Sequence, residues 1–206
     1  MLTSAQTVFI VDDDAAVRDS LQMLVRSNNL AVRTYDSASS FLEEYSPEQS
    51  GCLVLDVRMP DINGLELQRI LEKKHFKMPI IFVSGHGDVP MAVEAMKAGA
   101  MEFLQKPFSD HELLESIEAA LQRDRNYRAS LLQHEEFDSL LHTLTPREHE
   151  VMTKMMDGYA NKKIASDLGI SQRTVEIYRA NVMHKLRVGS LAELMKHALA
   201  HDSHGS

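Results

Sequence analysis

Short apolar runs alternate with amphipathic stretches along the first part of the chain. The apolar runs predict five strands, at residues 8–11, 31–35, 52–57, 79–84 and 102–105. Between them, apolar residues at helical spacing predict helices over 15–27, 39–44, 65–72 and 89–97, and one from Ser109. Strands that alternate with helices indicate a parallel sheet covered on both faces. We therefore expect a doubly wound, flavodoxin-like α/β domain, which binds ligands at the carboxyl ends of its five parallel strands.

The pattern changes after this domain. Between Pro107 and Pro146 the chain contains neither glycine nor proline, and Leu113, Ile117 and Leu121 recur every four residues. A flexible linker would be expected to contain Gly, Ser or Pro. The pattern instead predicts a long helix that continues from the first domain toward the second, with residues 125–140 as a helical linker.

The last part of the chain is helical throughout. Thr145 and Glu148 form a capping box, with Pro146 at the first helical position. A short helix is expected over 162–168 with Asn161 as its cap, and a longer one over 172–186 follows a turn. This spacing is typical of a helix-turn-helix unit. The domains are therefore expected at residues 1–124 and 141–206, on either side of the linker.

Charge is distributed unevenly between these parts. The net charge is −8, which by itself disfavours a nucleic-acid binder, but residues 139–206 hold 9 Lys and Arg against 7 Asp and Glu. An acidic first domain thus precedes a mildly basic second one. We expect a cytoplasmic protein that does not enter a membrane, because the chain shows one cysteine, no secretory signal and no apolar run of about 20 residues.

Polar or charged residues stand at the carboxyl ends of four of the predicted strands. They are Asp12 and Asp13 after the first, Asp56 after the third, Ser84 after the fourth and Lys106 after the fifth. Since these strand ends meet at one edge of a parallel sheet, the carboxylates would repel one another unless a cation lies among them. Oxygen ligands suit Mg²⁺. A carboxylate acceptor, a metal and a lysine are what phosphoryl transfer to a carboxylate needs. Asp14 is better placed as the N-cap of the helix that begins near Ala15.

The sequence resembles the receiver domain of two-component response regulators over residues 5–125. The resemblance rests on "VDDD", "LDVRMPDINGLE", "VSGHGD" and "FLQKPF", which in this order and spacing are specific, and "GHGDVPMAVEAMKAGA" resembles the FixJ-type subclass. It implies Asp56 as the phosphoacceptor, phosphorylated by a partner sensor histidine kinase. It also implies Mg²⁺ as the cofactor, held by Asp12, Asp13, Asp56 and the backbone carbonyl of Arg58.

The same resemblance implies a switch. Ser84 and Phe103 would form the switch pair, and Lys106 would contact the phosphoryl group. The peptide bond before Pro107 is expected to be cis. Phosphorylation would shift the receiver to a dimerising state. Since Phe103 has no hydroxyl, we expect its rotation between two packings to matter more than any hydrogen bond from it.

The helix over 172–186 has one face that suits a DNA groove. Val175, Tyr178, Val182 and Leu186 form its core face. On the other side and its flank, base edges in a major groove would be read by Arg173, Glu176, Ile177, Ala180 and Asn181. Phosphate contacts are expected from Lys162, Lys163, Thr174 and Lys185. Arg179 is expected to form an ion pair with Glu148 or Glu150, with a DNA phosphate contact as the alternative.

The stretch "LTPREHEVMTKMMDGYANKKIASDLGISQRTVEIYRANVMHKL" resembles the NarL/LuxR-type helix-turn-helix, over about residues 140–200. This resemblance implies that the last helix pairs two domains on a dyad-symmetric promoter site in double-stranded DNA, and that RNA polymerase is a partner in transcription activation. Within the family, the chain is similar to regulators of aromatic-compound catabolism.

Two other functions stay open at this stage. One is an aspartyl-phosphate enzyme that hydrolyses small phosphoesters, although Arg58 stands where such an enzyme would carry its second general acid. The other is constitutive DNA binding with a vestigial receiver, although no residue of the acidic site is missing. We expect no enzymatic activity apart from Mg²⁺-dependent self-phosphorylation and dephosphorylation at Asp56. Cys52 is expected to be buried and inert, and His86 to be either a surface residue or one that affects the lifetime of the phosphoryl group.

Overall fold

The computed structural model describes residues 6–85 and 89–202, with side chains described as far as residue 198. The chain divides into two compact units, Met1–Arg128 and Ala129–Ser206. His86, predicted to be a surface residue or one that affects the lifetime of the phosphoryl group, lies outside the described residues. No described helix is long and apolar enough to cross a membrane.

The first unit is built on a five-stranded parallel sheet in the order β2-β1-β3-β4-β5. Its strands are β1 (Thr7–Val11), β2 (Ala31–Tyr35), β3 (Gly51–Asp56), β4 (Ile80–Ser84) and β5 (Glu102–Gln105). The helices between them are α1 (Ala15–Ser27), α2 (Ala38–Glu44), α3 (Gly64–Lys73) and α4 (Val89–Lys97). This confirms the predicted doubly wound α/β fold, with element bounds within one or two residues of those expected.

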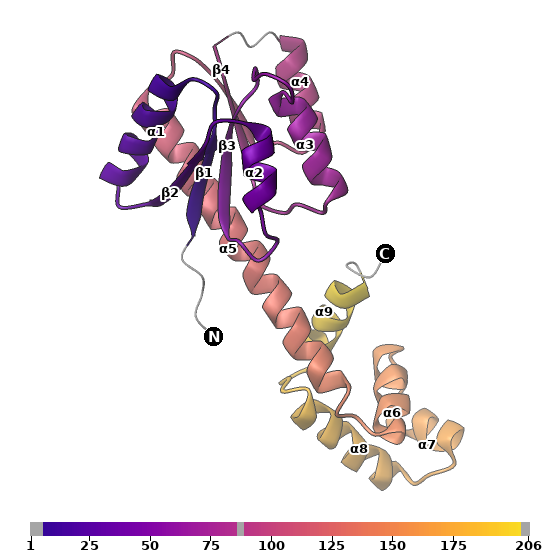
Figure 1. Ribbon diagram of the computed structural model, residues 1–206. Coiled ribbons are helices and arrows are strands. Elements are labelled where there is room, and N and C mark those ends of the chain that lie inside the picture. The colour runs from indigo at the N-terminus through magenta and orange to yellow at the C-terminus, as the bar shows by residue number, and fades with distance from the viewer. Residues whose placement is uncertain (1–5, 86–88, 203–206) are drawn as a thin grey trace. The chain divides into compact units, whose positions relative to one another are not determined.

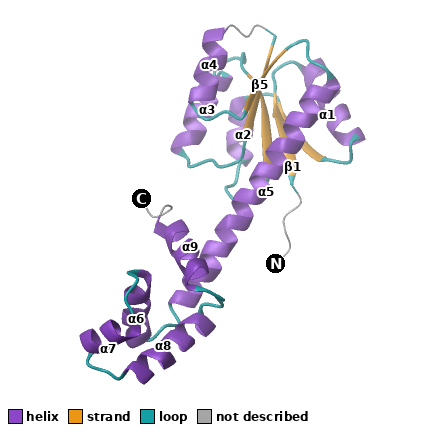
Figure 2. Ribbon diagram, turned by 180° about the vertical axis from the view of Figure 1, so that it is seen from behind, coloured by secondary structure: helices purple, strands orange, loops and turns teal. Residues whose placement is uncertain are grey.

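Alternating strand residues supply the two cores of this unit, because successive side chains of a strand point to opposite faces. Phe9, Leu53 and Phe82 face one layer, with α2, α3 and α4 over it (Figure 1). Their neighbours in sequence, such as Ile10 and Val54, face the other layer, where α1 and α5 lie (Figure 2). The sheet is therefore covered on both faces, which leaves its strand ends as the place for polar chemistry.

Helix α5 (Asp110–Leu141) is continuous over 32 residues, as the missing glycines and prolines predicted. Leu113, Ile117 and Leu121 lie on the sheet of the first unit. Phe137 belongs to the core of the second unit. One helix therefore contributes to both cores.

The second unit contains the end of α5, followed by α6 (Pro146–Met156), α7 (Asn161–Leu168), α8 (Gln172–Lys185) and α9 (Leu191–Asp202). The capping box of Thr145 and Glu148 is present at α6. Gly169 ends α7 in the left-handed conformation at φ 65°, and Ser171 caps α8 by accepting from Thr174 N. The prediction that Asn161 caps α7 is wrong. Asn161 is the first helical residue, and Ala160 holds the cap position without a side-chain hydrogen bond.

Candidate functional site

Two buried carboxylates and a lysine meet at the carboxyl ends of β1, β3 and β5. Asp12 follows β1 and is 1% exposed, and Asp56 ends β3 and is 7% exposed. Lys106 Nζ lies 3.0 Å from Asp12 Oδ2 and 3.0 Å from Asp56 Oδ1, so one ammonium bridges both carboxylates. The main chain holds the other oxygens, since Asp56 Oδ2 accepts from Arg58 N at 2.6 Å and Asp12 Oδ1 accepts from Asp14 N at 2.9 Å.

Burial and charge act against each other at this site. Burial raises the pKa of Asp56, and the hydrogen bond and positive charge of Lys106 only partly offset this. Burial lowers the pKa of Lys106, but its hydrogen bonds to Asp12 and Asp56 outweigh burial and leave that pKa above its usual value. Lys106 therefore stays charged, and it is the group that keeps Asp56 available as an anion.

The remaining predicted receiver residues lie around this pair. Ser84 ends β4, is 1% exposed, and its carbonyl accepts from Lys106 N at 2.8 Å. Phe103 on β5 is half-buried, with its ring centroid 6.2 Å from that of Phe82. The side chains of Asp13 and Arg58 are exposed. The peptide bond between Lys106 and Pro107 is cis, as expected.

The donor set fits a hard cation. Among residues 6–85 and 89–202, no three His, Cys, Asp or Glu side chains form a preassembled metal site. Mg²⁺ does not require one, because it commonly takes one or two carboxylates and keeps several waters. Asp12 and Asp56 supply two buried carboxylates within reach of one ammonium. Asp13 and the carbonyl of Arg58 are the expected further oxygen ligands.

Two other residues singled out from the sequence have structural roles. Asp14 is the N-cap of α1, as predicted, and its Oδ1 accepts from Ala16 N at 2.8 Å and from Val17 N at 3.3 Å. Cys52 is fully buried, and burial raises the pKa of its thiol to about 12, with the charge of Asp124 acting in the same direction. The thiol therefore stays protonated and unreactive, because the thiolate is the nucleophile.

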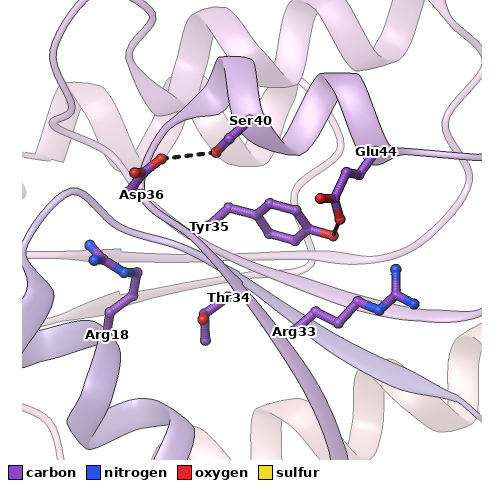
Figure 3. A pocket seen from close by; sticks show the side chains of 7 residues that line it. All are labelled: Arg18, Arg33, Thr34, Tyr35, Asp36, Ser40 and Glu44. Carbon is purple, nitrogen blue, oxygen red and sulfur yellow. Dashed lines mark hydrogen bonds between the residues drawn. The ribbon is translucent and has the colours of Figure 1, made fainter.

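Of two cavities in the first unit, one borders the acidic site. One, of about 380 Å³, lies between α1 and the start of α5; its lining includes Leu21, Leu24, Lys106 and Phe108. The other, of about 460 Å³, lies along the edge strand β2 (Figure 3), and none of the predicted site residues lines it. Its polar groups bond to one another, as Tyr35 does to Glu44 and Ser40 to Asp36.

Helix α8 presents the predicted surface. Val175 and Val182 are 0% exposed and belong to the core of the second unit, whereas Ile177 is 52% exposed. The other predicted base-reading residues are also exposed, namely Arg173, Glu176, Ala180 and Asn181. Lys162 and Lys163 are exposed on α7, and Thr174 is half-buried. The structure thus brings the proposed base-reading side chains to the exposed side of one helix.

A second prediction in this unit, besides the Asn161 cap, is also wrong. In the described part of the chain, Arg179 forms no ion pair with Glu148 or Glu150. Glu148, which is 3% exposed, instead accepts from Lys185 Nζ at 2.6 Å, and Glu150 pairs with Arg147 at 2.7 Å. The hydrogen bond from Lys185 lowers the pKa of Glu148 to about 2. Lys185, expected at a DNA phosphate, is therefore engaged inside the unit.

Comparison with known families addresses one of the open functions, the aspartyl-phosphate enzyme. Residues 8–118 match the family described as "Response regulator receiver domain". Residues 142–198 match "Bacterial regulatory proteins, luxR family". The chain is a response regulator. It belongs to those that carry a LuxR-type helix-turn-helix, and it is a DNA-binding transcription regulator rather than a conventional enzyme.

Relatives of this response regulator match over nearly the whole chain. Nodulation protein W of Bradyrhizobium diazoefficiens is 47% identical over 92% of this chain and 83% of its own length. The transcriptional regulatory protein FixJ of Azorhizobium caulinodans is 47% identical, over 93% of this chain and 91% of its own. A solved structure of the response regulator StyR is 47% identical with a TM-score of 0.81, covering 95% of this chain and 98% of that one.

Sequence reasoning missed two groups that the structure makes prominent. One is the pair of Glu148 and Lys185. The other is Asp124, a 1%-exposed carboxylate on α5. A signal for Asp124 was present, because it is the next residue on the helix face of Leu113, Ile117 and Leu121, where an apolar residue would be expected.

Proposed function

We propose that Asp56 accepts a phosphoryl group from a sensor histidine kinase and that this modification drives promoter binding. The observation that carries the proposal is the bridging of Asp56 and Asp12 by Lys106 at the carboxyl ends of the sheet. In the transfer, the P–N bond to the kinase histidine breaks and a P–O bond to an Asp56 oxygen forms. The imidazole leaves neutral or takes a proton from solvent.

Each residue has a definite task in this step. Asp56 is the nucleophile, and Lys106 holds an oxygen of the incoming group with the ammonium that now bridges the two carboxylates. Asp12 and Asp13, with the carbonyl of Arg58, would hold Mg²⁺, which neutralises charge on the phosphoryl oxygens when bound. Asp13→Ala should therefore abolish the Mg²⁺-dependent reaction.

The kinase is expected to dock beside the site. The cavity of about 380 Å³ between α1 and the start of α5 has an apolar lining from Leu21, Leu24 and Phe108 and includes Lys106. A helix of the kinase seated there would bring its histidine close to Asp56. Apolar anchors next to a charged reaction centre are typical of helix-in-groove recognition.

Phosphorylation would then change the surface formed by α4 and β5. The modification adds about −1.5 to −2 charge, which Ser84 and Lys106 are placed to meet. Phe103, on β5, would change its packing when Ser84 and Lys106 move toward the phosphoryl group. Helix α4 exposes Val89 at 77%, Val93 at 44% and Met96 at 45%, which share one helix face. This apolar face is the surface proposed for homodimerisation.

DNA binding would follow from pairing of two chains. In the proposed complex, α8 enters the major groove of each half of a dyad-symmetric promoter, with Arg173 on a guanine and Glu176 on a cytosine amino group. Ile177 and Ala180 contact thymine methyl groups, and Asn181 reads a further base. Lys162, Lys163 and Thr174 take phosphates. Lys163 would exchange its exposed ion pair with Asp167 for a phosphate, and Lys185 would first have to leave Glu148.

The protein is proposed to act in the cytoplasm and to activate transcription with RNA polymerase. Control of aromatic-compound catabolism is the pathway that the sequence resemblance favours. Nodulation protein W is as similar to this chain as the StyR structure is, at 47% identity each. Sequence identity alone therefore does not show which pathway this protein controls. Footprinting on genomic DNA would identify the promoters that it binds.

The decisive test compares the natural chain with Asp56→Asn. Acetyl phosphate and Mg²⁺ should increase the DNA affinity of the natural chain and leave that of the variant unchanged, and removal of Mg²⁺ by a chelator should abolish the increase. If Asp56→Asn gained the same affinity, the proposed mechanism would be wrong.

A further inference from the structure

Helix α5 is attached to the first unit by a buried polar cluster that lies several turns after the start of the helix, away from Lys106. The apolar face that packs on the sheet ends at Leu121. Asp124 occupies the next position on that face, and Arg128 follows one turn later. The Asp124 side chain is fully buried and that of Arg128 is 28% exposed. The last two positions of this face therefore carry opposite charges where apolar residues would be expected.

Asp124 accepts hydrogen bonds from three separate segments. Its Oδ2 accepts from Ser50 Oγ at 2.5 Å and Gly51 N at 3.0 Å, at the start of β3, and from Gln6 Nε2 at 3.1 Å, directly before β1. Arg128 Nε lies 3.1 and 3.2 Å from its two oxygens. We call this cluster the Asp124 node; its members are Asp124, Gln6, Ser50, Gly51 and Arg128.

The node also holds the main chain of α5 and of the loop before β3. Gln6 Nε2 donates to the carbonyl of Leu121 at 2.8 Å. Arg128 donates to the carbonyls of Glu48 and Gln49. These bonds cross more than 70 residues of sequence, so they join α5 to the amino-terminal ends of β1 and β3.

A charged group is a costly way to attach a helix. Burying a carboxylate costs several kcal/mol unless its oxygens are hydrogen-bonded, and an apolar residue of similar size would often stabilise the fold as well or better. Directional hydrogen bonds additionally define the rotation of the helix about its axis and its position along that axis. The node therefore specifies how α5 is held.

The node and the acidic site share two strands. Asp12 follows β1 and Asp56 ends β3, while Gln6 precedes β1 and Gly51 begins β3. Helix α5 itself begins shortly after Lys106. A continuous set of packed elements thus connects the phosphoacceptor with the helix that continues into the second unit, and packed elements of this kind can carry energetic coupling between sites.

We propose that the Asp124 node couples the receiver to α5, with Asp124 as a positioning residue that transmits phosphorylation of Asp56 to the DNA-binding unit. This inference rests on the proposed function. Without the node, α5 would be free to rotate and fray beyond Leu121. Phosphorylation would then still occur but would reach the second unit weakly.

The test uses the full-length chain and three node variants. Asp124→Asn keeps an oxygen for Ser50 and Gly51 but turns an amide donor toward Arg128. Arg128→Gln removes the cation from a partly exposed position and leaves the other bonds of Asp124 in place, so it is expected to fold. In the double variant, the glutamine oxygen can accept from the asparagine amide. Arg123→Gln, an exposed arginine on the same helix, is the matched control.

Two measurements separate coupling from folding. The first is incorporation of phosphate at Asp56 from acetyl phosphate and Mg²⁺, which should match the natural chain in every variant. The second is the gain in DNA affinity on adding beryllofluoride, measured on duplexes that the natural chain selects from a random library. This gain should fall about fivefold or more in each single variant, recover in the double variant and be unchanged in Arg123→Gln.

Hydrogen exchange supplies an independent local measurement. Amides of residues 124–136 should exchange faster in the single variants, while those of 113–121 should not. An undiminished gain in both single variants, or no recovery in the double variant, overturns the coupling role. Failure of the natural chain itself to gain affinity would instead overturn the proposed function, so the two failures can be told apart.

Discussion

Replacing Glu148 with Ala should destabilise the second unit by about 3 kcal/mol. Glu148 Oε2 accepts from Lys185 Nζ at 2.6 Å, from Thr145 N at 2.8 Å and from Thr145 Oγ1 at 2.9 Å. A hydrogen bond to a charged group contributes about 1.5–3 kcal/mol. Loss of the capping-box bonds adds about 1 kcal/mol. We use the lower part of the first range because the Lys185 side chain is 32% exposed.

Native-state hydrogen exchange is the suitable assay, because it reports the free energy of opening of α6 and α8 separately from that of the first unit. A loss of 3 kcal/mol makes their slowest amides exchange roughly 100-fold faster. Glu150→Ala is the matched control, since Glu150 lies on the same helix and pairs with Arg147 at 2.7 Å on the surface. Exposed pairs contribute about 0–1 kcal/mol. An equal effect of the two substitutions would contradict the stabilising role of the Glu148–Lys185 pair.

The same pair predicts a pH dependence. The hydrogen bond from Lys185 lowers the pKa of Glu148 from 4.5 to about 2. A carboxyl whose pKa is lower in the folded state stabilises the fold above its unfolded pKa. That stabilisation is lost as pH falls from 4.5 toward 2. The stability difference between the natural chain and Glu148→Ala should therefore shrink over this range, and a difference that stays constant would contradict the assignment.

Three further predictions concern single side chains. Asp14→Ala should cost about 1 kcal/mol of stability in denaturant unfolding and leave phosphorylation of Asp56 unchanged; a loss of phosphorylation would place Asp14 in the site. Lys106→Met should slow labelling of Asp56 by acetyl phosphate about 100-fold. It should also raise the pKa of Asp56 further, so that on acidification the labelling rate begins to fall at a higher pH. An unchanged pH dependence of the labelling rate would count against the Lys106 bridge. Arg173→Ala should cost about 1–3 kcal/mol of DNA binding and relax one base position, whereas Lys162→Ala should weaken all sequences and reduce the salt slope by about 1; equal behaviour of the two would exclude base reading by Arg173.

Much of the acidic site could be predicted from order and spacing. Parallel strands bring their carboxyl ends to one edge, so Asp12, Asp56 and Lys106 had to converge once the strands were recognised. The exposed side of α8 followed from helical periodicity, and Val175 and Val182 are buried as expected. These predictions succeeded because a repeat of two or 3.6 residues determines the face on which a side chain lies.

Periodicity does not indicate which side chain of a distant segment a given residue will contact. Local spacing was enough to predict the fold class, the order of the elements, the long helix and the face of each strand and helix. The pairing of Glu148 with Lys185 rather than Arg179 became evident only in three dimensions, as did the bonds from Asp124 on α5 to the segments that begin β1 and β3. Such contacts depend on how far apart in space two segments lie that are distant in sequence, and on how far their side chains reach. The local spacing of residues along the chain does not contain this information.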